Sequence, residues 1–183
     1  RLLARYIYLD DEERTRIANE NKGDLFISIH TNAAFRKGAN GVETYFLSFD
    51  ASDDDARRVA AFENTVIDLK GKSLDKDRDN LKAILMDMTQ TEFLNESSQI
   101  AEIIQSNLSS EMGGENRGVK QAPFFVLMGT AMPSALIEIG FITNPQDEKR
   151  LASDEIQDVI ANSILKSILS FDDILQVKVG YAK

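Results

Sequence analysis

The sequence predicts a three-layer α/β domain in which a twisted, mostly parallel sheet is flanked by helices on both faces. Short apolar runs alternate with segments of helical periodicity along the chain, and buried parallel strands need crossover helices that cover both faces. The chain has 183 residues, of which 43% are hydrophobic, enough for one core. We therefore interpret residues 1–183 as a single domain.

The N-terminal segment predicts a helix followed by a buried strand. Asp10 and Glu13 have the spacing of a helix N-cap box, which starts a helix over 11–21. The run 24–30 is short, nearly continuously apolar and rich in β-branched and aromatic residues, as a buried strand is. This strand ends at His30, the only histidine of the chain.

A second strand and a series of helices follow. The alternation over 42–47 predicts a strand with one more polar face. The capping pattern recurs at Ser52 and Asp55, and apolar residues then follow at helical steps as far as Leu69, where a charged loop interrupts them. Helical periodicity resumes over 81–108, and we expect these helices to cover the sheet.

The C-terminal part predicts two further strands and a long helix. The runs 123–128 and 135–139 are short and apolar, which favours strands. Amphipathic periodicity over 156–168 predicts the helix, and the apolar segment 174–179 is predicted to be an extended tail.

Composition argues against several classes of partner. The 21 Lys and Arg against 30 Asp and Glu give a formal charge of -9, which repels phosphate backbones and anionic lipids. We therefore expect no nucleic-acid partner, and no run has the length of a membrane-spanning helix. The absence of cysteine rules out a thiolate metal site but fits an exported or a cytosolic protein equally well.

Two residues at predicted strand ends are candidates for chemistry, because sheets of this kind bind ligands outside the carboxyl ends of their strands. A lone histidine such as His30 is usually a hydrogen-bonded structural residue, and metal ligation is the alternative. Glu138 interrupts the apolar run 135–142, so it forms a buried ion pair, is protonated, or faces a functional cavity.

Three other charged residues are weaker candidates. Glu43 also interrupts an apolar strand, but the looser alternation there favours a solvent-facing or supporting carboxylate. Arg117 and Lys120 are predicted to lie in a turn between a helix and a strand, where they face water. A contact with an acidic substrate is the alternative for these two.

One imidazole and one carboxylate at the same sheet edge suggest metal-assisted hydrolysis. In such sites zinc polarises a carbonyl and activates water while a glutamate acts as base. A catalytic zinc normally takes three protein ligands, and this chain offers one His and no Cys. The ligand set is therefore incomplete unless two carboxylates substitute.

Several motifs occur in a fixed order over roughly 5–170. They are Arg14-Thr15-Arg16-Ile17-Ala18-Asn19, Asp24-Leu25-Phe26-Ile27-Ser28-Ile29-His30-Thr31-Asn32-Ala33, Gly41-Val42-Glu43-Thr44-Tyr45-Phe46, Ser97-Ser98, Arg117-Gly118-Val119-Lys120-Gln121-Ala122, Met132-Pro133 and Glu138-Ile139-Gly140-Phe141-Ile142-Thr143-Asn144. In this order they resemble the zinc-dependent N-acetylmuramoyl-L-alanine amidases of the bacterial cell wall.

The resemblance implies a peptidoglycan hydrolase that cleaves the amide between N-acetylmuramoyl and the L-alanine of the stem peptide. It implies that His30 is a zinc ligand and that Glu138 is the catalytic glutamate. It also implies peptidoglycan as the partner and a periplasmic or extracellular location. We expect a monomer without membrane insertion.

The family supplies an earlier histidine and a helix glutamate as further zinc ligands, and this chain has neither at the matching place. Because the chain also opens on Arg1, we expect a catalytic domain that lacks its N-terminal strand and helix. By itself it should bind zinc poorly and lyse no wall material.

Some members of the family carry an inserted helix, at about 70–95 here, that plugs the site until a protein activator releases it. The short charged link favours an ungated form.

Two other functions stay open. One is an inactive or non-catalytic peptidoglycan-binding fragment of the same fold, and the other is a cytosolic metallohydrolase for small amides. The presence of both His30 and Glu138 disfavours the non-catalytic alternative.

Overall fold

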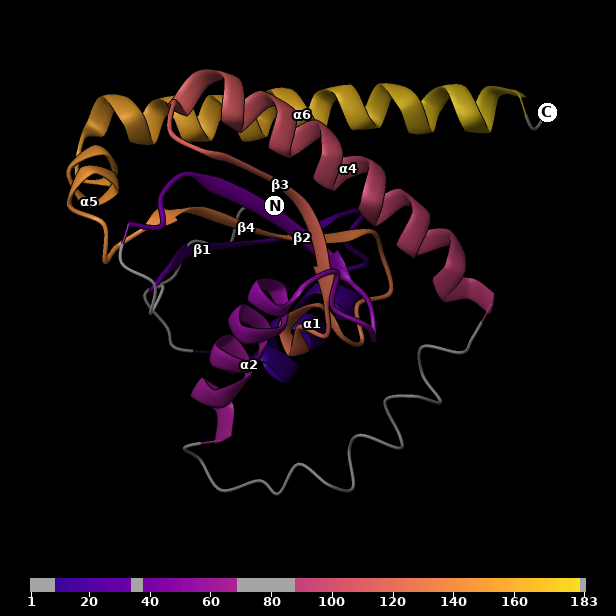
Figure 1. Cartoon of the computed structure of the whole chain (residues 1–183). Coiled ribbons are helices and arrows are strands. Elements are labelled where there is room, and N and C mark those ends of the chain that lie inside the picture. Colours follow the sequence, from indigo (N-terminus) through magenta and orange to yellow (C-terminus); the bar gives the residue numbers. More distant parts are fainter. Residues whose placement is uncertain (1–8, 34–37, 69–87, 182–183) are drawn as a thin grey trace.

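The computed structural model describes residues 9–33, 38–68 and 88–181, in which a four-stranded sheet lies between two layers of helices (Figure 1). The strands are β1 (Phe26–Asn32), β2 (Val42–Leu47), β3 (Asn116–Ala122) and β4 (Ser134–Phe141). The helices are α1 (Asp11–Glu20), α2 (Asp54–Asp68), α4 (Met88–Met112), α5 (Pro145–Leu151) and α6 (Asp154–Tyr181), with a 3-10 turn η1 (Phe125–Leu127). Helices α4 and α6 lie on one face and α1 and α2 on the other, so the predicted α/β fold is confirmed.

The sheet has the strand order β1-β4-β2-β3. Strand β1 runs parallel to β4, and β2 runs parallel to β3, whereas the central β4 and β2 are antiparallel. Two of the three pairings are therefore parallel, as predicted, and the antiparallel one lies in the middle. At one edge of the sheet, the carboxyl ends of β1 and β4 thus meet the amino ends of β2 and β3. We call this edge the mixed edge.

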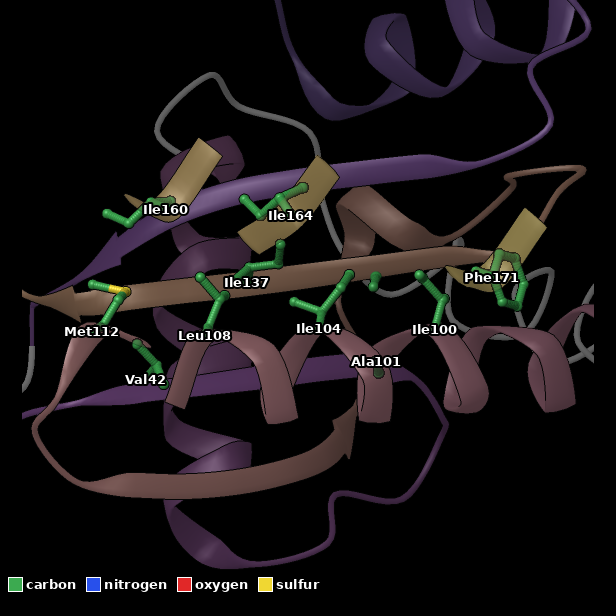
Figure 2. Close-up of a cluster of buried hydrophobic side chains, with 11 residues drawn as sticks. Val42, Ile100, Ala101, Ile104, Leu108, Met112, Ile137, Ile160, Ile164 and Phe171 are labelled. Atoms are coloured by element: carbon green, nitrogen blue, oxygen red, sulfur yellow. The ribbon is translucent and has the colours of Figure 1, made fainter. Parts of the chain in front are cut away.

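The core beneath α4 and α6 is made mainly of aliphatic side chains, with Phe171 at one end (Figure 2). Ile104 and Leu108 are four residues apart on α4, so they lie on one stripe of that helix. Ile160 and Ile164 repeat the spacing on α6, and both stripes pack against Ile137 of β4. Full burial of a side chain of this size stabilises the fold by about 1.5–3 kcal/mol.

The core on the opposite face is smaller and combines aromatic with small residues. Tyr45 and Phe124 pack edge to face, with ring centroids 4.8 Å apart. Ala56 and Ala60 of α2 are fully covered, and their small side chains let this helix approach the sheet closely. This face also carries the candidate site.

Side-chain caps mark the starts of α1 and α2, and the cap of α2 differs by one residue from the prediction. The Asp10 side chain accepts a hydrogen bond from the Glu13 backbone N–H at 2.9 Å, which confirms the predicted start of α1. The cap of α2 is Asp53 and not Ser52, because the Asp53 carboxylate accepts the Ala56 N–H at 2.7 Å.

The strand predicted over 123–128 is wrong. The third strand lies earlier, at Asn116–Ala122, in a segment with few apolar residues at an outer position of the described sheet. Pro123 follows it and has no N–H to donate to a neighbouring strand. The apolar run instead forms η1, which buries Val126 and Leu127.

Two features near the C-terminus also differ from the sequence prediction. The tail predicted to be extended over 174–179 is helical, because α6 continues to Tyr181 and Phe171 and Leu175 pack at helical spacing. Helix α5 was not predicted, although Asn144 caps it through two backbone N–H groups.

The predicted helix over 81–108 is confirmed from Met88 onward as α4. Its earlier part lies outside the described residues, as does most of the region 70–95 that matches the inserted helix of some amidases. Within the described ranges, none of the helices is both long and apolar enough to cross a membrane.

Candidate metal and catalytic site

Three polar residues form a row across the sheet at the mixed edge. His30 of β1 lies opposite Glu138 of β4, which lies opposite Glu43 of β2. Residues directly opposite in a sheet place their side chains on the same face. Tyr45, two residues after Glu43, belongs to the core beneath α2, so the row faces α2 as well. The structure therefore brings the two predicted site residues together, as strand-end placement suggested.

Both ring nitrogens of His30 have polar neighbours. Nδ1 lies 2.9 Å from Oε2 of Glu63 on α2, and Nε2 lies 2.8 Å from the Ser28 hydroxyl. The His30 side chain is 19% exposed, so the ring is held in place yet remains reachable from one side. His30 is thus hydrogen-bonded, as the structural alternative from the sequence predicted. The same contacts fix the orientation of the ring, which metal ligation also requires.

The Glu138 carboxyl group is fully buried. Neither of its oxygens has a hydrogen-bond partner within the described part of the chain. Burial, and then the charges of Glu63 and Glu43, raise the pKa of Glu138 to about 9. A buried ionisable group without a partner is costly to the fold, so this carboxyl fits the functional alternative rather than the buried ion pair.

Glu43 is buried as well, but it is fully paired. Its Oε1 accepts a hydrogen bond from Asn32 Nδ2 at 3.1 Å, and its Oε2 accepts one from Arg117 Nε at 2.9 Å. Lys120 Nζ lies 3.5 Å from the same oxygen. Of the two roles predicted for Glu43, the solvent-facing one is therefore wrong, because β2 is buried on both faces, and the supporting carboxylate is the one that stays.

Arg117 and Lys120 do not lie in a turn, and that prediction is also wrong. Both are on β3, where Glu43 draws their side chains inward. The Arg117 guanidinium also stacks over the Phe141 ring, 5.0 Å from its centroid, and Lys120 reaches Asp53 at 3.3 Å.

His30, Glu63 and Glu138 form a group that could hold a metal ion, because one ligand atom of each lies within 4.8 Å of the others. Two tetrahedral ligands at about 2.1 Å from zinc lie about 3.4 Å apart, so small side-chain shifts suffice. Glu63 was not predicted from the sequence. The signal was a glutamate within the apolar stripe of a helix, between Phe62 and Val66.

Comparisons with known proteins show the family to which the chain belongs. A sequence model of the family described as N-acetylmuramoyl-L-alanine amidase matches residues 6–170. The chain belongs to this family. The matched range agrees with the 5–170 covered by the ordered motifs.

Two curated relatives show how much of a longer protein the chain matches. The chain is 33% identical to the uncharacterized protein YqiI of Bacillus subtilis over 166 residues, 91% of this chain and 60% of that protein. It is 32% identical to the N-acetylmuramoyl-L-alanine amidase AmiA of Escherichia coli over 161 residues, 87% of this chain and 55% of that protein. The chain therefore spans less than two thirds of each relative.

A solved amidase structure has the same fold. The N-acetylmuramoyl-L-alanine amidase from Clostridium difficile 630 superposes with a TM-score of 0.61 at 25% sequence identity. The match covers 91% of this chain and 67% of that one. It supports the three-layer α/β architecture within the amidase family.

Proposed function

We propose that this protein is a peptidoglycan hydrolase that cleaves the amide between N-acetylmuramoyl and the L-alanine of the stem peptide. The observation that carries the proposal is the buried, unpartnered carboxyl of Glu138 beside His30 and Glu63. Membership of the amidase family supports the reaction type. The name of AmiA supports the substrate bond.

Zinc is the metal that this donor set suits, because zinc prefers imidazole and carboxylate ligands in hydrolytic sites. We propose that His30 Nδ1 and a Glu63 carboxylate oxygen hold it, with Glu138 alongside. When bound, zinc polarises the amide carbonyl and activates water. The unpartnered oxygens of Glu138 fit such a group better than they fit a closed hydrophobic core.

Glu138 is the proposed catalytic residue. A carboxylate at this position takes a proton from the attacking water and returns it to the amide nitrogen as the C–N bond breaks. The buried surroundings keep bulk water from competing for the proton.

Four earlier expectations stay predictions. We propose that the protein acts outside the cytoplasmic membrane, where peptidoglycan is found, and as a monomer. Release by a protein activator is the alternative to an ungated site. That these residues alone bind zinc poorly and lyse no wall material also stays a prediction, since the candidate group contains one imidazole and two carboxylates.

The test compares a full-length form of the protein with its Glu138→Gln variant on purified muropeptides, with products identified by mass spectrometry. Removal of the acid–base group should lower the rate by about 10²–10⁴-fold, while thermal unfolding shows that the fold is kept. Glu148→Gln, at an exposed position of α5, is the matched control and should cleave normally. Equal cleavage by Glu138→Gln would refute the assignment. Muropeptide binding without cleavage by any form would favour the non-catalytic alternative.

A further inference from the structure

Glu43 connects the two outer strands of the sheet across the strand that carries Glu138. Strand β4 lies between β1 and β2 in the sheet. The hydrogen bond from Asn32 on β1 to Glu43 on β2 therefore crosses β4 at the mixed edge. On its other side, Glu43 is held by Arg117 and Lys120 of β3. One carboxylate thus joins residues from three strands around the fourth.

The contact with Asn32 holds β1 where its pairing with β4 becomes irregular. His30 pairs with Glu138, but Asn32 pairs with Phe141, so two steps along β1 match three along β4 and the extra residue lies on β4. Such a bulge re-aims the side chains beside it, and its shape depends on what holds its far end. Asn32 is 5% exposed, and its carbonyl accepts the Ile142 N–H at 2.8 Å. Glu43 supplies the side-chain contact.

The same network reaches the neighbours of the other two site residues. The Arg117 guanidinium stacks over Phe141, three residues after Glu138 on β4. Lys120 links Glu43 to Asp53, which caps the helix that carries Glu63. None of these contacts reaches His30 or Glu138 directly, so Glu43 acts on the geometry of the site through the backbone, besides the charge by which it helps to raise the pKa of Glu138.

We propose that Glu43 is a positioning residue whose carboxylate, by holding Asn32 across β4, fixes the end of β1 opposite the β4 bulge and with it the His30 ring beside Glu138. The inference rests on the proposed function only for the identity of the site that is positioned. A glutamine cannot replace this carboxylate fully. Its amide would turn an N–H donor towards either Asn32 or Arg117, both of which already donate.

The chain offers a direct probe, because His30 is its only histidine. With selectively ¹⁵N-labelled histidine, the imidazole gives one set of NMR signals, which can be read without metal or substrate. We compare the unmodified protein with Glu43→Gln, Asn32→Ala and the double variant. Asp53→Asn is the matched control, because it removes a charge from Lys120 but keeps a good helix cap.

We expect Glu43→Gln and Asn32→Ala to displace the His30 signals in the same direction. The double variant should show no larger displacement than the single variants, because both changes remove the same hydrogen bond between Asn32 and Glu43. Asp53→Asn should leave the signals in place. Zinc affinity, measured by competition with a chelator, should fall by about 10–100-fold in the first two variants, as for other residues that orient a ligand.

Unmoved His30 signals in both variants would overturn the inference, as would displacements that add in the double variant. If Glu43→Gln does not fold, Asn32→Ala decides, because it removes the same bond without exposing a charge. Failure of the proposed function is seen separately. A protein that cleaves no muropeptide or binds no zinc still reports on Glu43 through the metal-free His30 signals.

Discussion

The two halves of the mixed edge treat a buried carboxyl group in opposite ways. Glu43, on the β2–β3 half, is 1% exposed and meets an arginine, a lysine and an amide. Glu138, directly opposite on the β1–β4 half, is 0% exposed, and its oxygens meet no hydrogen-bond donor among the described residues. Equal burial with unequal pairing separates a carboxyl that supports the fold from one that is available to a ligand.

The difference also has an electrostatic side. The charge of Glu43 is balanced locally, yet it still contributes to raising the pKa of Glu138, after burial and Glu63. The paired half therefore influences the unpaired half without touching a ligand itself. Variants that remove a charge or a pairing partner from one half test this difference between the two halves.

The largest effect on stability is expected when the paired half loses its main cation. Arg117→Ala leaves Glu43 buried with Lys120 as its only cation among the described residues, and breaking a buried pair typically destabilises by about 3–5 kcal/mol. For a chain of this size, that lowers the midpoint of thermal unfolding by roughly 6–20 °C. Arg57→Ala, which removes an exposed ion pair, is the control and should change stability little. Equal midpoints for the two variants would contradict the comparison.

A smaller, pH-dependent effect is expected in the unpaired half. The folded pKa of Glu138, about 9, lies above its ordinary value of 4.5. The contribution of Glu138 to the free energy of unfolding is therefore greatest below about pH 4.5, and it is lost as pH rises towards 9. Glu138→Gln does not suffer this loss. Between pH 5 and pH 8, without metal, it should gain about 2–4 kcal/mol relative to the unmodified protein.

Denaturant unfolding at the two pH values, with a chelator present, measures this gain. Glu148→Gln is again the control, because an exposed glutamate should show no such trend. Parallel stability curves for Glu138→Gln and the unmodified protein would mean that Glu138 is ionised or paired after all.

The smallest effect is expected at the outer end of the network. Asp53 is 46% exposed, and its ion pair with Lys120 is accordingly weak. Asp53→Asn keeps the cap of α2, so it should change the free energy of unfolding by less than about 1 kcal/mol. A larger loss in urea unfolding would place Asp53 inside the paired half rather than at its rim.

The sequence predicted the site best where local pattern and strand direction are enough. His30 ends an apolar run and Glu138 interrupts one, and both strands run the same way, so the two residues meet at one edge. Glu63 could not be found in this manner, because its contact with His30 depends on how α2 crosses the sheet. Only tertiary packing sets that crossing.

The misplaced elements have a related cause. The polar segment of β3 does not alternate like a strand, because Arg117 and Lys120 point inward to satisfy Glu43. The burial of Glu43 could not be predicted without knowing that these cations lie on the neighbouring strand. The apolar run after Pro123 was more strand-like in composition, but it packs as a turn. In each case the structure of the segment depends on contacts with residues that are distant in sequence.

The place of β4 in the sheet has a consequence for folding. Strand β1 ends at Asn32, but its neighbour β4 begins only at Ser134, and β4 is also the partner of β2. Closing such long loops is slow, and contacts between distant segments form late. On the ribosome, His30 must wait for Glu138 to be synthesised before the two can meet. We therefore expect that no nascent chain that ends before Glu138 assembles the site.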